Sequence, residues 1–203
     1  PSSIHHLLPF QYSQSHDLLH IRRSTTKAIL NEMIREIRCT RKFTIAIKPN
    51  IIIYQTMSIY IEAIQSTRSL IIVIDYDHAR DVDTTFASIV RQIFSFVFQT
   101  PNSVHTWTHL RRQLRYFLPF ELFNKDQLVQ VYAMDVQSQF EQWYHGSKSS
   151  TDDRQNWDRW TLSDAIALCF NESLDPYLFD VNHFLAISKL SKFIQRFPSE
   201  SFA

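Results

Sequence analysis

The chain has 203 residues, of which 44% are hydrophobic and 14% aromatic, and its formal net charge is +1 at pH 7. This length and apolar content suit one domain with a sizeable core, and a charge so close to zero points to no class of partner. Glycine occurs once, as Gly146. Because loops that cradle phosphate need glycine for close backbone approach, the composition argues against Walker-type NTPases, Rossmann dehydrogenases and hydrolases with a nucleophile elbow.

The first 23 residues are polar and rich in histidine, and their weak periodicity predicts an N-terminal arm before a domain of residues 24–203. Four histidines lie in this arm: His5, His6, His16 and His20. They suggest a metal site, but their spacing is irregular and no cysteine accompanies them, which favours a solvated segment.

Helix and strand patterns follow the arm. A helix is expected from a cap at Ser24, Thr25 or Thr26 to about Arg38, because its apolar residues form one stripe. Three strand-like segments come next: Phe43–Ile47, Met57–Ile64 and Leu70–Ile74. The last of them is continuously apolar and is therefore expected near the centre of a sheet. The short links between the three segments predict an antiparallel meander.

After the meander the apolar period becomes that of helices alternating with short strands. The expected elements are a helix capped by Asp81 or Asp83, a strand at Val104–Trp107, a helix containing Leu110 and Leu114, a strand at Val129–Ala133, a helix containing Val136 and Phe140, a helix capped by Thr161 and a last helix at 180–197. This order predicts an α/β fold with a mixed sheet, in which an antiparallel three-strand meander precedes alternating strands and helices. Ribonuclease-H-like folds have this order of strands and helices.

Four segments, spread over residues 24–197, carry a resemblance to a known family: TTKAILNEMIREIRCTRKFTIAIKPN, SVHTWTHLRRQL, TLSDAIALCFNESLD and DVNHFLAISKLSKFI. In order and spacing they resemble the 3′–5′ exonucleases of the ribonuclease D and Werner type. The resemblance implies a ribonuclease-H-like fold and an active site of four carboxylates. In that family these carboxylates hold two divalent ions, about 4 Å apart, which clamp the attacking water and the leaving oxygen of a phosphodiester.

The positions that correspond to the family's four carboxylates and to its water-orienting tyrosine carry other residues. The Asp-x-Glu pair at the end of the first strand corresponds to Lys48 and Asn50, the second acidic motif to Gln113, and the Asp and Tyr of the last helix to His183 and Phe179. Lys48 would place a cation where the family places Mg²⁺. The resemblance therefore implies a degenerate enzyme, a pseudoenzyme without a metal cofactor.

A second acid-x-acid pattern, Asp75 and Asp77 in IDYD, also follows an apolar strand. If it were the first motif, the chain would be an active 3′–5′ exonuclease that uses Mg²⁺ or Mn²⁺, with Asp135 or Asp180 as a further ligand. The spacing opposes this alternative, because only residues 78–82 separate the pattern from the next helix and two more strands would have to fit there.

The densest basic cluster contains His105, His109, Arg111, Arg112 and Arg115. The three arginines are the candidates for phosphate contact, although a solvated helix face opposite the apolar residues is the favoured interpretation. Trp157 and Trp160 border the polar loop at 145–159 and are the candidates for base stacking. The predicted partner is therefore single-stranded nucleic acid, and the alternative is a protein-interaction module on the same fold.

The two cysteines, Cys39 and Cys169, are too few for a disulfide framework and form no CxxC pair. Reduced thiols and an intracellular location are expected, in the nucleus or the cytoplasm. No apolar run approaches the roughly 18 residues of a membrane span, so no membrane partner is expected.

Overall fold

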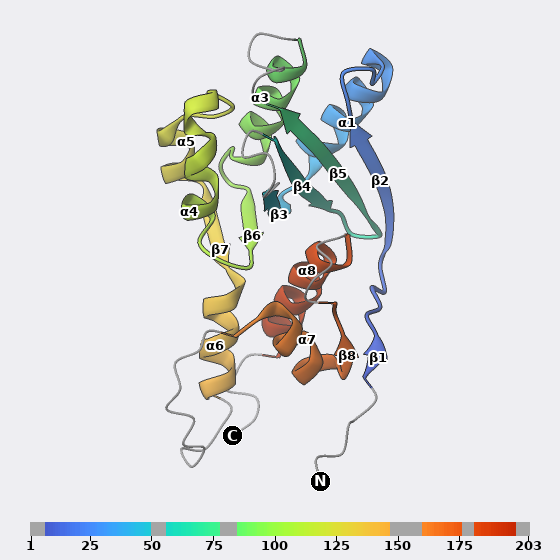
Figure 1. Cartoon of the computed structure of the whole chain (residues 1–203), viewed down its shortest axis with the longest axis vertical. Coiled ribbons are helices and arrows are strands. Elements are labelled where there is room, and N and C mark those ends of the chain that lie inside the picture. Colours follow the sequence, from blue (N-terminus) through green and yellow to red (C-terminus); the bar gives the residue numbers. More distant parts are fainter. Residues whose placement is uncertain (1–6, 50–55, 78–84, 147–159, 176–180, 198–203) are drawn as a thin grey trace. The chain divides into compact units, whose positions relative to one another are not determined.

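The structure is a computed structural model that describes residues 7–49, 56–77, 85–146, 160–175 and 181–197. The chain has an α/β fold and forms two compact units (Figure 1). We call residues 14–134 the sheet unit, and residues 1–13 together with 135–203 the helical unit. Each unit is described by itself.

A mixed six-stranded sheet, in the order β2-β5-β4-β3-β6-β7, organises the sheet unit. Its strands are β2 (Ser15–Ile21), β3 (Lys42–Pro49), β4 (Thr56–Ile64), β5 (Arg68–Asp77), β6 (Ser103–Thr106) and β7 (Tyr132–Asp135). Strands β3, β4 and β5 are antiparallel neighbours, which confirms the predicted meander. Strand β6 runs parallel to β3 and strand β2 parallel to β5, so the sheet is mixed, as predicted.

Strand β2 corrects the expectation of a loose arm for the residues that form it. Ser15–Ile21 pairs in parallel with Arg68–Ile74 of β5, and Ile21 is only 1% exposed. Most other side chains of this edge strand are exposed, so the sequence lacks the alternation of a half-buried strand. His16 and His20 lie on β2. The other two histidines, His5 and His6, lie outside the described residues.

The helices of the sheet unit are α1 (Lys27–Cys39), α3 (Thr85–Val97), α4 (Leu110–Leu114), the 3-10 helix η1 (Arg115–Phe120) and α5 (Lys125–Gln130). Thr26 caps α1, as predicted, because its hydroxyl accepts a hydrogen bond from the Ile29 N–H. The caps expected for α3, Asp81 and Asp83, lie outside the described residues. Helix α5 was not predicted, and it begins with a capping box formed by Asn124 and Gln127.

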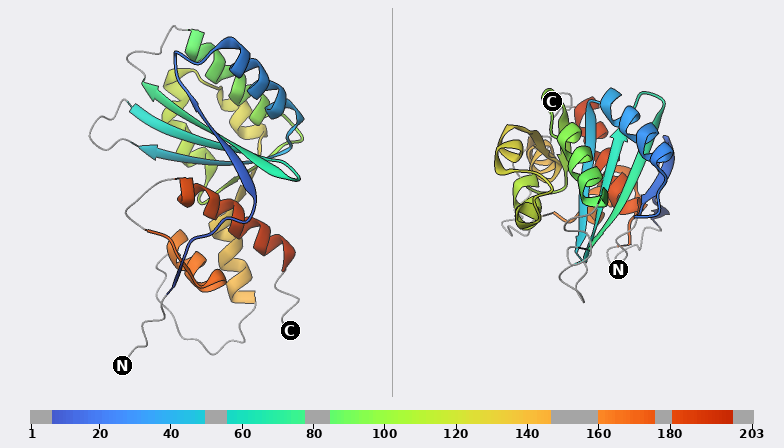
Figure 2. Two further views of the ribbon diagram at one scale, coloured as in Figure 1. Left: turned by 90° about the vertical axis from the view of Figure 1, so that its right-hand side faces the viewer. Right: turned by 90° about the horizontal axis from the view of Figure 1, so that it is seen from above.

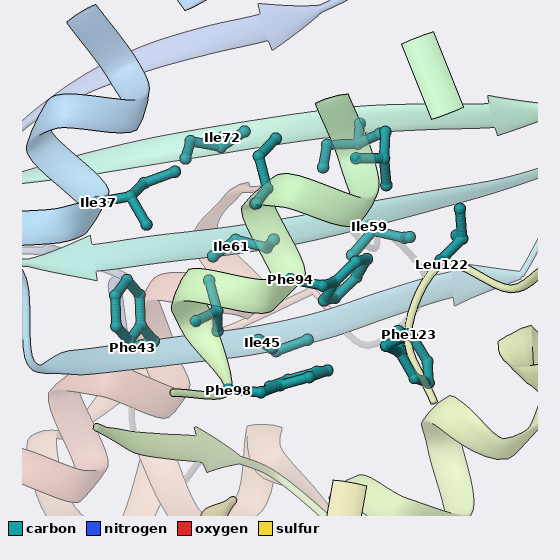
Figure 3. Packing of buried hydrophobic residues seen from close by; sticks show 14 of the residues in the cluster. Ile37, Phe43, Ile45, Ile59, Ile61, Ile72, Phe94, Phe98, Leu122 and Phe123 are labelled. Carbon is teal, nitrogen blue, oxygen red and sulfur yellow. The ribbon is translucent and has the colours of Figure 1, made fainter. Parts of the chain in front are cut away.

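The core of the sheet unit lies between one face of the sheet and helices α1 and α3, which run side by side on that face (Figure 2). Phe94 of α3 and Phe98, which directly follows this helix, point toward the strands, where they meet Ile45 and Ile59 (Figure 3). Phe123 joins them, with ring centroids 5.0 Å from Phe94 and 5.4 Å from Phe98. The apolar face of α3 therefore builds much of this core.

The helical unit contains α6 (Val136–Gly146), α7 (Leu162–Phe170) and α8 (Val181–Arg196), together with the short parallel pair β1 (Leu8–Pro9) and β8 (Glu172–Ser173). Thr161 caps α7, as predicted, by accepting a hydrogen bond from the Asp164 N–H at 3.1 Å. None of the helices in the described ranges is long and apolar enough to cross a membrane.

Candidate functional site

The face of the sheet opposite the α1–α3 core carries a row of polar side chains. Phe43 and Ile45 belong to the core, so Thr44 between them points to the other face. Thr44 pairs with Glu62 of β4 and with His105 of β6, and directly paired residues share a face. These three polar residues, which we call the buried row, are at most 3% exposed. This face therefore buries polar side chains beside apolar ones such as Ile71 and Val73.

A second polar row, which we call the terminal row, crosses the same face at the end of β3. It contains Lys48, which pairs with Ser58 of β4, and Asp75 of β5, which pairs with Ser58 from the other side. The Ser58 hydroxyl donates a hydrogen bond to Asp75 Oδ1 at 2.7 Å. Neighbouring strands lie about 4.8 Å apart, so the row places an ammonium and a carboxylate about 10 Å apart at the backbone. Sequence reasoning did not single out Ser58, although polar residues alternate with apolar ones along β4.

The residues matched to the family's metal ligands are distributed over both units. Lys48 is exposed near the end of β3, and Gln113 lies on α4, where its Nε2 donates to Thr108 Oγ1 at 2.5 Å. Both belong to the sheet unit, whereas His183 lies in the first turn of α8 in the helical unit. The remaining two positions, Asn50 and Phe179, lie outside the described residues.

Asp75 and Asp77, the alternative metal ligands, lie two positions apart at the end of β5 and so share a face. Asp135 has a structural role, because its Oδ1 accepts a hydrogen bond from the Ser138 N–H at 3.1 Å at the start of α6. Asp180 lies outside the described residues. Across the parts of the chain that the structure describes, no three His, Cys, Asp or Glu side chains come close enough together to hold a metal ion.

The predicted basic cluster divides into buried, structural and exposed members. Arg111 donates from Nε to the Leu128 carbonyl at 3.1 Å and from Nη2 to the Val129 carbonyl at 2.9 Å. It therefore attaches α4 to α5. His105 is 3% exposed and cannot reach a ligand in solution. Arg111 is itself exposed, as are His109, Arg112 and Arg115.

The role of Arg111 leads to a stability prediction. We expect Arg111→Ala to destabilise the sheet unit by about 2 kcal/mol, because two charge-assisted hydrogen bonds to carbonyls of α5 are lost. Arg112→Ala, the matched control on the same helix, should change the free energy of unfolding by less than about 0.5 kcal/mol. Urea unfolding followed by circular dichroism measures both. Equal effects of the two substitutions would contradict the structural role of Arg111.

Trp160, a candidate for base stacking, lies in an aromatic cluster of the helical unit. Its ring centroid is 4.8 Å from that of Tyr144 and 5.2 Å from that of Phe140. Its carbonyl accepts a hydrogen bond from Gln137 Nε2 at 2.7 Å. These contacts favour a packing role for Trp160. The other candidate, Trp157, lies outside the described residues.

Two titratable groups are neutral at pH 7 for physical reasons that the structure makes clear. Burial, together with the positive charge of Lys42, lowers the pKa of His105 to about 4. Burial raises the pKa of the Cys169 thiol to about 12. Cys169 is therefore a protonated thiol, not a nucleophile.

Comparison with known proteins adds no further assignment. No model of a protein family matches the sequence, and a comparison with curated proteins finds no relative. The site residues are therefore interpreted from their own chemistry, and the resemblance to 3′–5′ exonucleases stays a prediction.

Proposed function

We propose that the chain is a ribonuclease-H-like domain of the 3′–5′ exonuclease type that has lost two-metal hydrolysis and binds single-stranded nucleic acid. The observation that carries this proposal is the terminal row. In the register of the resemblance, Lys48 takes the first position of the Asp-x-Glu pair, and its strand partners are Ser58 and, beyond it, Asp75. An ammonium group at that position repels Mg²⁺ instead of binding it.

The order of helices and strands along the chain supports the ribonuclease-H-like part of the proposal. Helix α1 leads into the antiparallel meander β3-β4-β5, and then helices alternate with β6 and β7. This is the element order on which the resemblance rests. The polar rows on one sheet face add to it, because such a face suits a site for a charged ligand.

Nucleic-acid binding is supported by exposed positive charge. Arg112 and Arg115 are exposed on α4 and η1, in the segment that flanks the substrate cleft in the resembling family. Lys48 supplies a further exposed cation at the end of β3. An ammonium can bind a phosphate directly where the active enzymes hold it through a metal ion. The same substitution that removes catalysis therefore keeps an attraction for the phosphate backbone.

The binding test uses fluorescence anisotropy with labelled short single strands of RNA and DNA. We expect binding that weakens between about 50 and 200 mM salt. The double variant Arg112→Glu/Arg115→Glu should bind at least about tenfold more weakly and lose about 1.4 from the salt slope, the value for two phosphate contacts on a single strand. The control Arg22→Glu/Lys27→Glu has the same net charge and alters exposed residues elsewhere in the sheet unit.

The outcomes of this test are distinct. Equal losses in the two double variants would attribute binding to net charge and would contradict the assignment of Arg112 and Arg115. The absence of any binding by the unchanged chain at low salt would overturn the nucleic-acid part of the proposal.

A hydrolysis assay tests the loss of catalysis. A 5′-labelled single strand should stay intact in Mg²⁺ or Mn²⁺, and Asp75→Asn and Asp77→Asn should make no difference. Metal-dependent shortening that either substitution abolishes would establish instead an active 3′–5′ exonuclease that uses these two carboxylates.

The second candidate function, a protein-interaction module, is favoured by a different observation. Val129 on α5 and Tyr132 on β7 are 53% and 66% exposed, although both are large and apolar in body. They lie close in sequence at the edge of the sheet where β7 is the last strand. Exposed apolar side chains at such an edge are typical of contact surfaces. Absence of nucleic-acid binding at every salt concentration would favour this candidate.

A further inference from the structure

A pocket of about 540 Å³ opens on the sheet unit where α1 ends, β3 begins and β4 turns into β5. Its lining includes Arg35, Thr40, Arg41, Lys42, Gln65 and Arg68. Lys42 begins β3 and Lys48 lies near its end, so the rise of a strand separates the pocket from the terminal row by about 20 Å. The pocket is therefore distinct from the site to which the proposed function refers.

The lining of the pocket is predominantly positive. The lining contains four cations and one carboxylate, Glu36. Glu36 Oε1 is 2.6 Å from the Arg68 guanidinium. Asp17 also pairs with Arg68. Arg35 has a partner in Glu32, outside the lining, at 3.4 Å. The charge of Arg68 is thus largely compensated by two carboxylates, whereas the exposed pair with Glu32 compensates Arg35 only weakly.

The remaining two cations, Arg41 and Lys42, are exposed, and no carboxylate of the described residues forms an ion pair with either. Arg41 donates from Nη1 to Asn102 Oδ1 at 3.3 Å, a neutral contact that orients the guanidinium without neutralising it. Because no carboxylate in the described ranges pairs with them, these two adjacent cations create a positive potential at this pocket.

The negative end of the α1 dipole would oppose an anion in this place. Thr40 reduces that effect, because its N–H donates to the Ile37 carbonyl at 3.0 Å and its hydroxyl donates to the Glu36 carbonyl at 2.9 Å. Two carbonyls of the last turn, those of Glu36 and Ile37, are thus already hydrogen-bonded, and the formal charges of Arg41 and Lys42 outweigh the partial charge of the helix end.

We propose that this pocket binds a terminal phosphate group, carried either by a small phosphorylated molecule or by the phosphorylated end of a nucleic acid strand. A phosphomonoester is close to a dianion at pH 7 and matches two uncompensated cations, whereas an internal phosphodiester carries one charge. Guanidinium offers a planar fork and ammonium a point charge, the two ways in which proteins bind phosphate. The volume accommodates more than the phosphate alone, in the range of small-molecule sites.

Cys39 provides a direct probe of the pocket. It lines the cavity and is exposed, whereas Cys169 stays protonated because burial raises its pKa to about 12. Neutral iodoacetamide should therefore label Cys39 and leave Cys169 as an internal control. We expect inorganic phosphate, titrated against chloride at constant ionic strength, to slow the labelling of Cys39 with a saturable dose dependence, as read by peptide mass spectrometry.

The variant Arg41→Gln/Lys42→Gln should raise the phosphate concentration for half-protection at least about tenfold. Arg38→Gln is the matched control, because Arg38 lies on the same helix end outside the lining and stacks on Phe96 with 4.7 Å to the ring centroid. It should change half-protection less than about twofold. If folding of the double variant is impaired, Lys42→Arg, which keeps the charge, should retain protection. Non-saturable protection, or equal loss in the control, would overturn the proposal.

Three further probes distinguish the two possible sources of the phosphate group, a small molecule and the end of a nucleic acid strand. Adenosine 5′-monophosphate that protects Cys39 more strongly than inorganic phosphate would identify a small phosphorylated molecule. Stronger protection by a 5′-phosphorylated single strand than by the same strand with a 5′-hydroxyl would identify a nucleic acid end. Equal protection by both strands, together with no effect of inorganic phosphate or the nucleotide, would overturn the site. The pocket proposal does not involve Arg112 or Arg115. It can therefore be wrong while the proposed function is right.

Discussion

Replacement of Lys189 by methionine is expected to destabilise the helical unit by about 3 kcal/mol, because it leaves the carboxylate of Glu172 buried without its cation. Lys189 Nζ lies 2.7 Å from Glu172 Oε1 and 2.6 Å from Oε2. The two side chains are only 19% and 13% exposed, so solvent screens their interaction little. Methionine keeps most of the side-chain volume, so the loss comes from the charge and not from a cavity.

Lys189 also joins three segments that are distant in the sequence. From α8 it donates a hydrogen bond to the Gln11 carbonyl at 2.7 Å, next to β1, and its ammonium lies 4.4 Å from the ring centroid of Phe170 and 5.1 Å from that of Phe10. Loss of the ammonium removes all of these interactions together. We therefore expect Lys189→Met to release the segment around β1, with faster proteolysis there than in the unchanged chain.

The matched control is Lys192→Met, at a position about one turn further along the same helix, α8. Lys192 is exposed and donates to the Tyr12 hydroxyl at 2.9 Å, so its replacement should cost less than about 1 kcal/mol. The double variant Lys189→Met/Glu172→Met should lose clearly less than the sum of its single variants, because neither charge then remains buried alone. Urea unfolding measures all four variants. Equal costs for the two lysines, or additive single effects, would contradict the importance of the buried pair.

The parts of the fold that could be predicted are those in which local pattern and burial agree. Residues Ile59, Ile61 and Ala63 alternate with polar neighbours in β4 and are fully buried, and the α3 stripe forms the core face. Strand β2 was missed because its side chains face solvent on most positions and its partner β5 is distant in sequence. Helix α5 was missed because it has a single buried residue, Leu128, although its capping box is a readable start signal.

The candidate site was predictable only where it depends on one strand. The position of Lys48 follows from the β3 pattern alone. Its row partner Asp75 depends on the pairing of three strands, which fixes the register after the fold is known. The partners of Arg111 are carbonyls of the missed helix α5, so its structural role could not be expected. The same long-range dependence hid the pocket, since α1, β3 and the β4–β5 turn meet only in the folded sheet unit.

The buried row leads to a second large effect, a loss of stability of the sheet unit between pH 6.5 and 4. His105 has an ordinary pKa of 6.5, which burial and the charge of Lys42 lower to about 4 in the folded chain. Between these values the unfolded chain binds a proton at His105 and the folded chain does not, so stability falls as the pH is lowered. A shift of one pKa unit corresponds to about 1.4 kcal/mol, so the free energy of unfolding should fall by about 3 kcal/mol in total. Below pH 4, His105 should cause no further loss of stability.

The control for this effect is His105→Gln, which keeps a polar side chain in the buried row and removes the titration. Its free energy of unfolding should vary less with pH across this window, and the difference between the two pH profiles isolates His105 from the carboxylates. Lys42→Gln should leave the histidine in place but raise its pKa, because one of the two causes of the depression is removed. The loss should then be smaller and complete at a higher pH. Parallel pH profiles for the unchanged chain and His105→Gln would show that His105 has the same pKa in the folded and the unfolded chain. Burial in the buried row would then not disfavour the protonated histidine.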